Sequence, residues 1–218
     1  MTLHYEVRRG ETSGHARLDW QVRDDGRYAI ELRAVDANNA GRPMPAALTP
    51  HWTSRGTLDA AGIAPERFAV SRRGRERHAA NFQREAGIVT FAGPARTWPL
   101  VQGVQDRLSW MLQLAAVLQA DPALEAAGAS VSMMVVGAHG DADIWTFTAL
   151  GTESIEGPHG EPIAAVLLQR ESRHVHDPRV QVWLAPDMYH LPVRLRLTLR
   201  RSGESTEFRL RALQPEAR

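Results

Sequence analysis

One stretch, residues 105–119, has the periodicity of a long helix in a chain that otherwise alternates like β-strands. Its apolar side chains cover most of the helix circumference, and a helix of that kind belongs in an interior. The polar exceptions are Arg107, Ser109, Gln113 and Gln119. At 1.5 Å per residue the helix would be about 22 Å long, roughly the width of the space inside a curled sheet. We therefore expect a helix that fills the inside of a sheet.

The remaining sequence alternates apolar and polar residues at period two, which is typical of half-buried antiparallel strands. The clearest hairpin joins strands at 15–23 and 27–35 through Asp24-Asp25-Gly26, because an Asp-Gly turn accepts positive φ. Residues 36–50 are rich in Asn, Pro and Ala and predict a loop. Other strands are expected near the N-terminus and at 51–58, 66–73, 75–83, 87–92, 131–137, 143–150, 162–171, 179–185, 192–201 and 205–213.

These segments predict a mainly β fold of about a dozen antiparallel strands. A sheet of that size does not stay flat and open. We expect it to curl into a barrel or half-barrel wrapped on the helix near 105–119. No internal repeat and no linker divides the 218 residues, so the prediction is a single domain, 1–218.

Composition excludes several classes of function. The chain has no Cys, which excludes disulfides, thiolate catalysis and Cys-ligated metals. Its net charge is +1, so the molecule as a whole has no strong attraction to nucleic acid or to membranes. All 26 basic residues are Arg, which indicates either a GC-rich genome or guanidinium groups that bind phosphates and carboxylates. The Arg-rich turn at 71–78 has no aromatic side chain for stacking on bases, so we expect no nucleic-acid partner.

No secretion signal and no segment long enough to span a membrane is apparent in the sequence. We therefore expect either a cytosolic protein or a mature domain without its export segment. We also expect a monomer.

The spacing His174-Val175-His176 places two imidazoles on the same face of a strand, as a zinc site can require. Such a site needs three or four ligands, and the distant candidates are His139, His159 and His190. Asp177-Pro178 marks a turn, so we interpret the pair as an exposed strand end and predict no metal site. The glycine-rich stretches at 137–141 and 157–160 match no phosphate loop and predict hairpin turns, so we also predict no cofactor.

Asp106, Arg107 and Ser109 form a polar cluster at the start of the expected helix. Asp106 occupies the position of an N-cap, where a carboxylate accepts a hydrogen bond from a free N–H and favours the positive helix end. Ser109 has no recognisable His-Asp pair to activate it as a nucleophile. We interpret the cluster as a helix cap or an interior polar group, and we predict no catalytic residue.

The C-terminal hairpin and the strand before it place Trp183, Arg194, Arg196, Arg209 and Arg211 on one face. A two-residue turn at 202–203 sets Arg196 opposite Arg209, and likewise Arg194 opposite Arg211. Like charges directly opposite destabilise a strand pair, so acids on the next strand, solvent or a bound anion should compensate. Trp183 lies near Arg194, where a cation–π contact can form. One hypothesis is a face that binds carboxylates or phosphates of a partner, and the alternative is a solvated outer face.

Four phrases occur together here: GTLDAAGIAPERF (56–68), TWPLVQGVQDRLSWMLQLA (97–115), VQVWLAPDMYHLPVRLRL (180–197) and GESTEFRLRAL (203–213). Together they resemble the bacterial "domain of unknown function 3108" family over nearly the whole chain. The most specific parts are 105–109 and 183–186. The resemblance implies an exported, mostly β protein that faces the periplasm of Gram-negative bacteria. It implies no established activity, and members of the family usually begin with an export or membrane-anchor segment.

Two functions from different classes remain open. The first is a non-enzymatic periplasmic binding or scaffold domain, with a hydrophobic or anionic envelope ligand such as a lipid or a cell-wall component. The second is a hydrolase with an unrecognised active site. A polar cleft around Asp106, His174 and His176 would favour the hydrolase. An apolar tunnel would favour a carrier of hydrophobic ligands, and a filled interior would favour a scaffold. Candidate pocket walls are Trp52, Trp98, Trp110, Met111 and Trp145.

Overall fold

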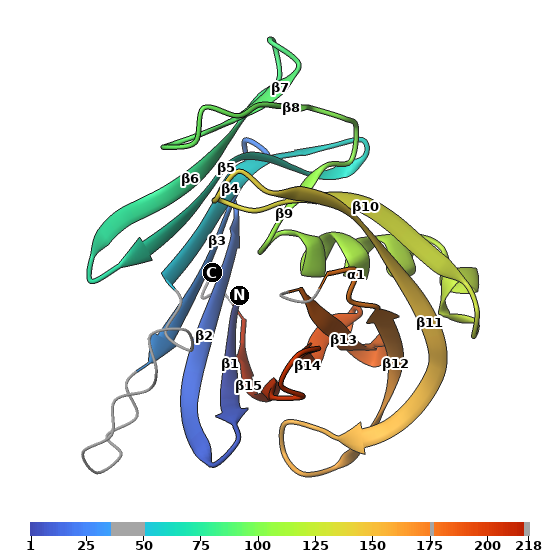
Figure 1. The fold of residues 1–218 in the computed structure, drawn as a ribbon. Helices are drawn as coiled ribbons and strands as arrows, with labels where there is room; N and C mark the ends of the chain where they lie inside the picture. The colour runs from blue at the N-terminus through green and yellow to red at the C-terminus, as the bar shows by residue number, and fades with distance from the viewer. Residues whose placement is uncertain (36–50, 175–176, 216–218) are drawn as a thin grey trace.

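The computed structural model describes residues 1–35, 51–174 and 177–215. These residues form one large curled sheet with an α-helix on its concave side (Figure 1). In chain order the elements are β1 (Thr2–Arg9), β2 (Thr12–Val22), β3 (Arg27–Val35), β4 (His51–Asp59), β5 (Gly62–Arg72), β6 (Arg75–Gln83), β7 (Ile88–Phe91), β8 (Trp98–Pro99), β9 (Gln105–Asp106), α1 (Trp110–Ala120), β10 (Ser130–Val136), β11 (Ala142–Glu156), β12 (Pro162–Arg170), β13 (Pro178–Ala185), β14 (Leu191–Leu199) and β15 (Ser205–Gln214).

The 15 strands of the described residues run in the order β8 back to β1, then β15 back to β9. The first and last strands of the chain therefore pair with each other in the middle of the sheet. The two outer strands, β8 and β9, are neighbours in sequence. Pairing is antiparallel throughout except between β9 and β10. The predicted mainly β, curled sheet is confirmed, and it stays open as a half-barrel.

Side chains cover part of the seam between the two ends of the sheet. The indole Nε1 of Trp98 in β8 donates a hydrogen bond to the carbonyl oxygen of Gly140, 3.1 Å away. The ring of His78 in β6 lies 4.0 Å from the ring of His139, centroid to centroid. Both contacts reach the turn between β10 and β11. The two halves thus touch where no ladder of backbone hydrogen bonds joins them.

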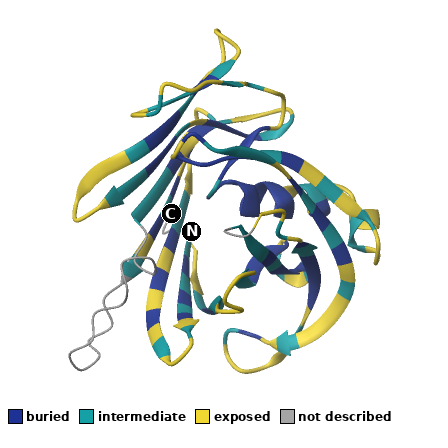
Figure 2. Cartoon of the chain, in the orientation of Figure 1, coloured by how far each residue is buried: buried dark blue, intermediate teal, exposed yellow. Residues whose placement is uncertain are grey.

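Burial alternates along the strands as the sequence predicts (Figure 2). In β1, Leu3, Tyr5 and Val7 are buried, and the residues between them are only partly buried. The expected hairpin of 15–23 and 27–35 is β2 and β3, which pair residue by residue. The expected loop at 36–50 lies outside the described residues.

The glycine-rich stretches close hairpins, as predicted. The amide of Gly137 donates to the carbonyl oxygen of Asp141, and the amide of Gly157 donates to that of Glu161. These turns join β10 to β11 and β11 to β12. Two short strands, β8 and β9, were not expected from the sequence, because two residues are too few to show a period.

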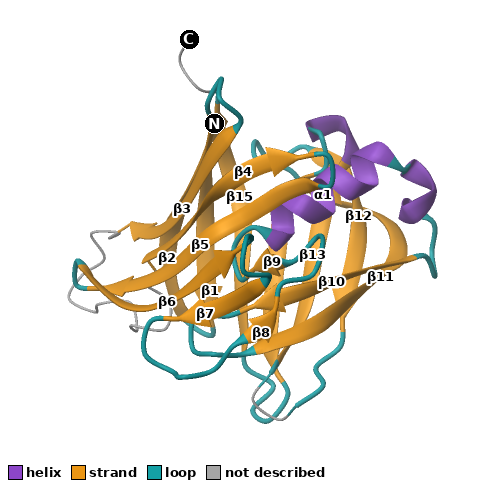
Figure 3. Cartoon of the chain, turned by 90° about the horizontal axis from the view of Figure 1, so that it is seen from above, coloured by secondary structure: helices purple, strands orange, loops and turns teal. Residues whose placement is uncertain are grey.

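Helix α1 begins at Trp110 rather than at 105, so the predicted start was wrong. Gln105 and Asp106 are held as β9 by pairing with β10, and the next three residues form a turn. The expected interior position is confirmed, because Leu114 and Leu118 are fully buried. Figure 3 shows the helix lying against the curled sheet.

Two glutamine side chains attach this region to the turn between β4 and β5. Gln113 of α1 accepts a hydrogen bond from the amide of Ile63 (2.7 Å) and donates to the carbonyl oxygen of Ala61 (3.0 Å). Gln105 donates to the carbonyl oxygen of Ile63 (2.7 Å). A side chain at Gly62 would lie 2.5 Å from the Gln113 amide oxygen, so only glycine fits this approach. The helix is therefore fixed to the N-terminal half of the sheet by polar contacts.

We expect Gln113→Ala to lower the free energy of unfolding by about 1–3 kcal/mol, because it leaves backbone groups of the β4–β5 turn without partners. Urea unfolding followed by circular dichroism measures the change. The exposed residue Gln102 offers the matched control, and Gln102→Ala should stay within about 0.5 kcal/mol of the parent. Equal effects of the two substitutions would contradict the anchoring role.

Candidate functional site

A cavity of about 190 Å³ lies between α1 and the concave face of the sheet. Its walls come from both halves of the sheet and from the helix, and most are aromatic or aliphatic. Of the five candidate pocket walls, four line it: Trp52, Trp110, Met111 and Trp145. The fifth, Trp98, lies at the seam instead. Leu195, Leu197 and Phe208 line the cavity from β14 and β15 and remain partly exposed.

An aromatic cluster forms one wall of this cavity. Trp110 of α1 stacks on Phe147 of β11, with ring centroids 4.9 Å apart. Trp145 lies beside both of them, 5.6 Å from Trp110 and 6.0 Å from Phe147. Such pairs stabilise a core beyond the area that they bury. The cluster therefore holds the helix and β11 in a fixed relation.

Two guanidinium groups contact the ring of Trp145. The Cζ atom of Arg107 lies 4.6 Å from the ring centroid and that of Arg170 lies 4.3 Å from it. Arg170 is buried and forms ion pairs with Asp177 and Asp143. Arg107 is about one quarter exposed and pairs with Asp141 at 2.7 Å. Of the two, only Arg107 lines the cavity.

Asp106 is buried and fully hydrogen-bonded, rather than being the N-cap of α1. Its carboxylate accepts hydrogen bonds from the amides of Leu108 and Ser109 (2.8 Å each) and from the hydroxyl of Ser54 (2.5 Å). The N-cap position belongs to Ser109, whose hydroxyl accepts from the amide of Asp106. Asp106, which was predicted to cap the helix, therefore stabilises the turn before the helix instead, because β9 extends to Asp106. Burial raises the pKa of Asp106 to about 6, and its hydrogen bonds oppose the rise.

The polar cluster of Asp106, Arg107 and Ser109 thus divides into two environments. Asp106 and Ser109 bond to each other and to the backbone, and no histidine is among their partners in the described chain. Arg107 points instead toward Asp141 and the ring of Trp145. Sequence spacing could not predict that Arg107 points away from Asp106 and Ser109, because the turn that separates them depends on the pairing of β9.

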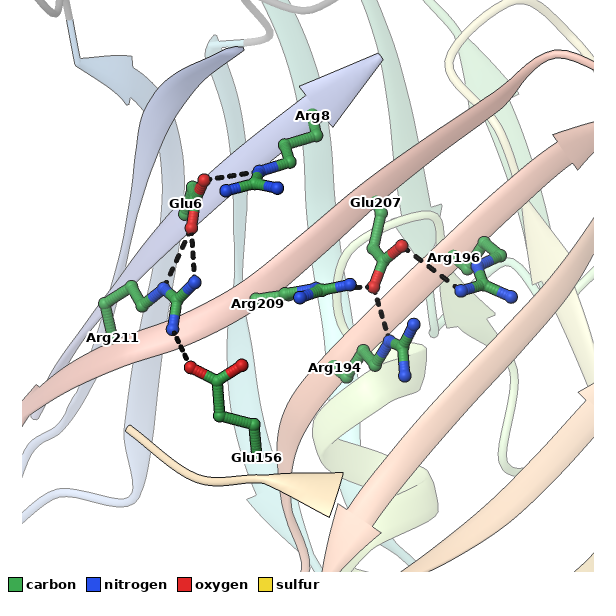
Figure 4. A network of polar contacts seen from close by, with 8 residues as sticks. All are labelled: Glu6, Arg8, Glu156, Arg194, Arg196, Glu207, Arg209 and Arg211. Atoms are coloured by element: carbon green, nitrogen blue, oxygen red, sulfur yellow. Dashed lines mark hydrogen bonds and ion pairs between the residues drawn. The ribbon is translucent and has the colours of Figure 1, made fainter. Parts of the chain in front are cut away.

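The arginines of the outer face surround carboxylates (Figure 4). Glu207 accepts from Arg194 at 2.5 Å, Arg209 at 2.8 Å and Arg196 at 3.2 Å. Burial raises the pKa of Glu207, but hydrogen bonds from Arg194 and Arg209 outweigh it and lower the pKa to about 2. Arg211 pairs with Glu6 of β1 (2.6 Å) and with Glu156 of β11 (3.0 Å).

The predicted register of this hairpin was wrong by two residues. Arg194 lies opposite Arg209, and Arg196 lies opposite Glu207. The chain turns through a longer loop, in which the amide of Leu199 donates to the carbonyl oxygen of Glu204. Acids on β15 itself, on β1 and on β11 supply the compensation that the like charges need. A bound anion is therefore not required to explain the cluster.

Trp183 lies on this face beneath two arginines, Arg194 and Arg196. The sequence predicts the contact with Arg194. Trp183 sits opposite Arg194 in the ladder of β13 and β14, and the Cζ atom of Arg194 is 4.6 Å from its ring centroid. The Cζ atom of Arg196 is 5.6 Å away. Trp183 is 3% exposed, and its Nε1 donates to Glu153 at 2.8 Å. Both the ring face and the indole N–H of Trp183 therefore have partners within the chain.

The histidines weighed as metal ligands are dispersed. His176 lies outside the described residues. His190 contacts Gln119 (2.9 Å) and Glu125 (2.8 Å), and His139 packs on His78. In residues 1–35, 51–174 and 177–215, no group of three potential ligands is placed to hold a metal ion.

Among the helices in the described part of the chain, none combines the length and the apolar character needed to cross a membrane.

These features define a class of protein: a curled antiparallel sheet around one helix and an apolar cavity. The chain belongs to the family described as "Protein of unknown function (DUF3108)", whose profile matches residues 2–206. The resemblance drawn from the four sequence phrases is thereby confirmed. A search of the curated proteins by sequence found no match.

A solved structure shares this fold. A β-barrel-like protein of domain of unknown function DUF1849 from Brucella abortus has a TM-score of 0.56 and 13% identity, covering 96% of this chain and 94% of that chain. The MucA/MucB complex of Pseudomonas aeruginosa has a TM-score of 0.41 and 13% identity, and the match covers 96% of this chain and 49% of that chain. A crystal structure of MucB has a TM-score of 0.38 and 13% identity, and the match covers 99% of this chain and 53% of that chain. This chain thus spans about half the length of the two MucB-containing matches. The likeness to the Brucella protein supports the fold alone.

The raised pKa of Asp106 predicts a pH dependence of stability. An unfolded Asp ionises near pH 4, whereas the folded carboxyl keeps its proton up to about pH 6. The folded state therefore binds more protons between these values, and stability falls as pH rises through this window by about 3 kcal/mol. Asp106→Asn removes this contribution. We expect the free energy of unfolding of the parent, minus that of Asp106→Asn, to decrease between pH 4 and pH 6.5.

Urea unfolding at a series of pH values measures this difference. Ser54→Ala supplies the internal comparison, because the Ser54 hydroxyl lowers the pKa of Asp106. Its loss should extend the fall in stability to higher pH. Parallel stability curves for the parent and Asp106→Asn would contradict the assignment.

Proposed function

We propose that this domain is a non-enzymatic binding domain of the cell envelope that holds an apolar ligand beside α1. The observation that carries the proposal is the cavity of about 190 Å³, walled by Trp52, Trp110, Phe208 and other apolar side chains. Ligand sites are typically concave and mostly apolar, with a few placed polar groups. A scaffold would have a filled interior, so the presence of this cavity argues against the scaffold alternative.

The size of the cavity limits the ligand. An engineered apolar cavity of about 150 Å³ binds benzene, so this cavity takes one ring or a chain segment of about six to eight carbons. A lipid with two long chains is far larger. The ligand is therefore a small hydrophobe, or a larger molecule that inserts one short apolar segment.

The hydrolase alternative is not favoured, because the polar groups that suggested it are engaged in the fold. Asp106 and Ser109 are buried and bonded to each other, and the cavity beside them is apolar. No described histidine is bonded to either side chain. The family resemblance supports a periplasmic, envelope-facing location for this domain, and a hydrophobic or anionic envelope component is the class of ligand that would be met there.

The test uses toluene as a charge-free probe and isothermal titration calorimetry of the purified protein. We expect saturable binding to the parent protein. Leu197→Trp places a large ring at the cavity wall and should weaken toluene binding at least tenfold, because it occupies the space that the probe needs.

Thr198→Trp is the matched control, since neighbouring residues of a strand face opposite sides of the sheet. It adds the same side chain to β14 outside the cavity lining and should leave toluene binding unchanged. Native mass spectrometry, followed by solvent extraction, identifies any hydrophobe that co-purifies. A parent protein that binds no toluene, or a Leu197→Trp variant that binds it equally well, would refute the proposal.

A further inference from the structure

Trp145, one wall of the cavity, has a buried indole N–H that the described residues leave unpaired. The indole Nε1 of Trp145 has no hydrogen-bond partner among the described residues, although Trp145 is only 3% exposed and lines the cavity. The corresponding atoms of Trp98 and Trp183 are both paired, with Gly140 and Glu153. A buried N–H without an acceptor is costly, so native structures rarely leave one. Neighbouring atoms cover this N–H, so an acceptor carried by a ligand reaches it only if those side chains move.

The cavity also contains one accessible positive charge. Arg107 lines it with a side chain that is about one quarter exposed, and its ion pair with Asp141 is made through Nη2. A guanidinium has five N–H donors, so donors remain for a second anion. Asp141 is about half exposed, so water screens this pair and weakens it. By contrast, Arg170 is buried and held by two aspartates, so it has no comparable freedom.

The hydroxyl of Tyr5, another polar group of the lining, is already satisfied. The hydroxyl of Tyr5 donates to the carbonyl oxygen of Pro192 at 2.7 Å. The rest of the wall near the helix is aromatic or aliphatic. The charged residue of the lining is Arg107, whose guanidinium carbon lies 4.6 Å from the ring centroid of Trp145. This is the arrangement of a site for a molecule with one polar end and one apolar end.

We infer that Arg107 forms a subsite for the carboxylate of a free, single-chain fatty acid of medium length. The inference rests on the proposed function, since the acyl tail occupies the apolar cavity. A carboxylate can accept from a guanidinium through two oxygens, which makes the hydrogen bonds stronger and directional. A chain of about six to eight carbons fits the volume of the cavity. A cationic head group is disfavoured here, because it would meet Arg107.

The test compares octanoate with 1-octanol, which has the same chain length and no charge. Tryptophan fluorescence and calorimetry of the full chain at pH 7 report both. We expect Arg107→Gln to lower the ratio of octanoate affinity to octanol affinity at least tenfold. Asp141→Asn releases Arg107 from its partner and should strengthen octanoate binding while leaving octanol unchanged.

Arg173→Gln is the matched control, because Arg173 pairs with Asp143 at the surface and does not line the cavity. It should leave both affinities unchanged. Chain length gives a further measure: affinity should rise about fourfold for each added methylene until the cavity is filled, and then level off.

The outcomes separate the two claims. Saturable toluene binding together with equal octanoate-to-octanol ratios in the parent and Arg107→Gln overturns this subsite and leaves the proposed function standing. Absence of toluene binding to the parent overturns both. Toluene binding is measured for every variant, so that a loss of octanoate affinity in a misfolded protein is recognised by a loss of toluene binding as well.

Discussion

Hydrogen bonds to three buried polar side chains of β9 and α1 hold this open sheet together. Gln105 and Gln113 bond to the backbone of the β4–β5 turn, and Asp106 accepts from Ser54 of β4. Because β9 pairs with β10, the same short segment is tied to both halves of the sheet. A closed barrel would make this link with a continuous ladder of backbone hydrogen bonds. Here side chains make it, and an ionisable group is buried as a consequence.

The outer face obeys a different constraint, which is the balance of charge across neighbouring strands. Arg194 and Arg209 face each other in the ladder, an arrangement that alone would destabilise the pair. Glu207 lies between them and contacts both, and the low pKa of Glu207 is the counterpart of that stabilisation. The charges are therefore balanced within the chain. The cavity, where Arg107 keeps N–H donors beyond its ion pair with Asp141, is a better candidate for ligand binding than this face.

Much of the fold follows from the local pattern of the sequence. Alternation along β1, and the Asp-Gly turn between β2 and β3, predict those strands and their pairing, because burial on one face is a local property. The apolar circumference of the 105–119 segment likewise predicts an interior helix. Its start could not be predicted, since a hydrogen bond from Ser54 and the pairing of β9 are contacts between distant segments.

The candidate site was harder to predict for the same reason. Four of its walls, three of them aromatic, could be proposed from the sequence, but the contact of Arg107 with Trp145 joins residues far apart in sequence. The register of β14 and β15 depended on a loop that is longer than a two-residue turn, so the opposed arginines were misassigned. Local patterns specify elements, whereas the polar contacts of a site depend on how the elements are brought together.

The cavity itself has an energetic consequence. An unfilled apolar cavity costs about 24 cal/mol per Å³ relative to a packed core, so about 190 Å³ corresponds to at most about 5 kcal/mol. That is comparable with the whole stability of many domains. Replacing Leu197 or Met111 by a larger residue would fill part of it, yet the chain has smaller side chains there. An interior that leaves this space open, with the guanidinium of Arg107 in its lining, is more stable with an amphiphilic ligand bound than without one.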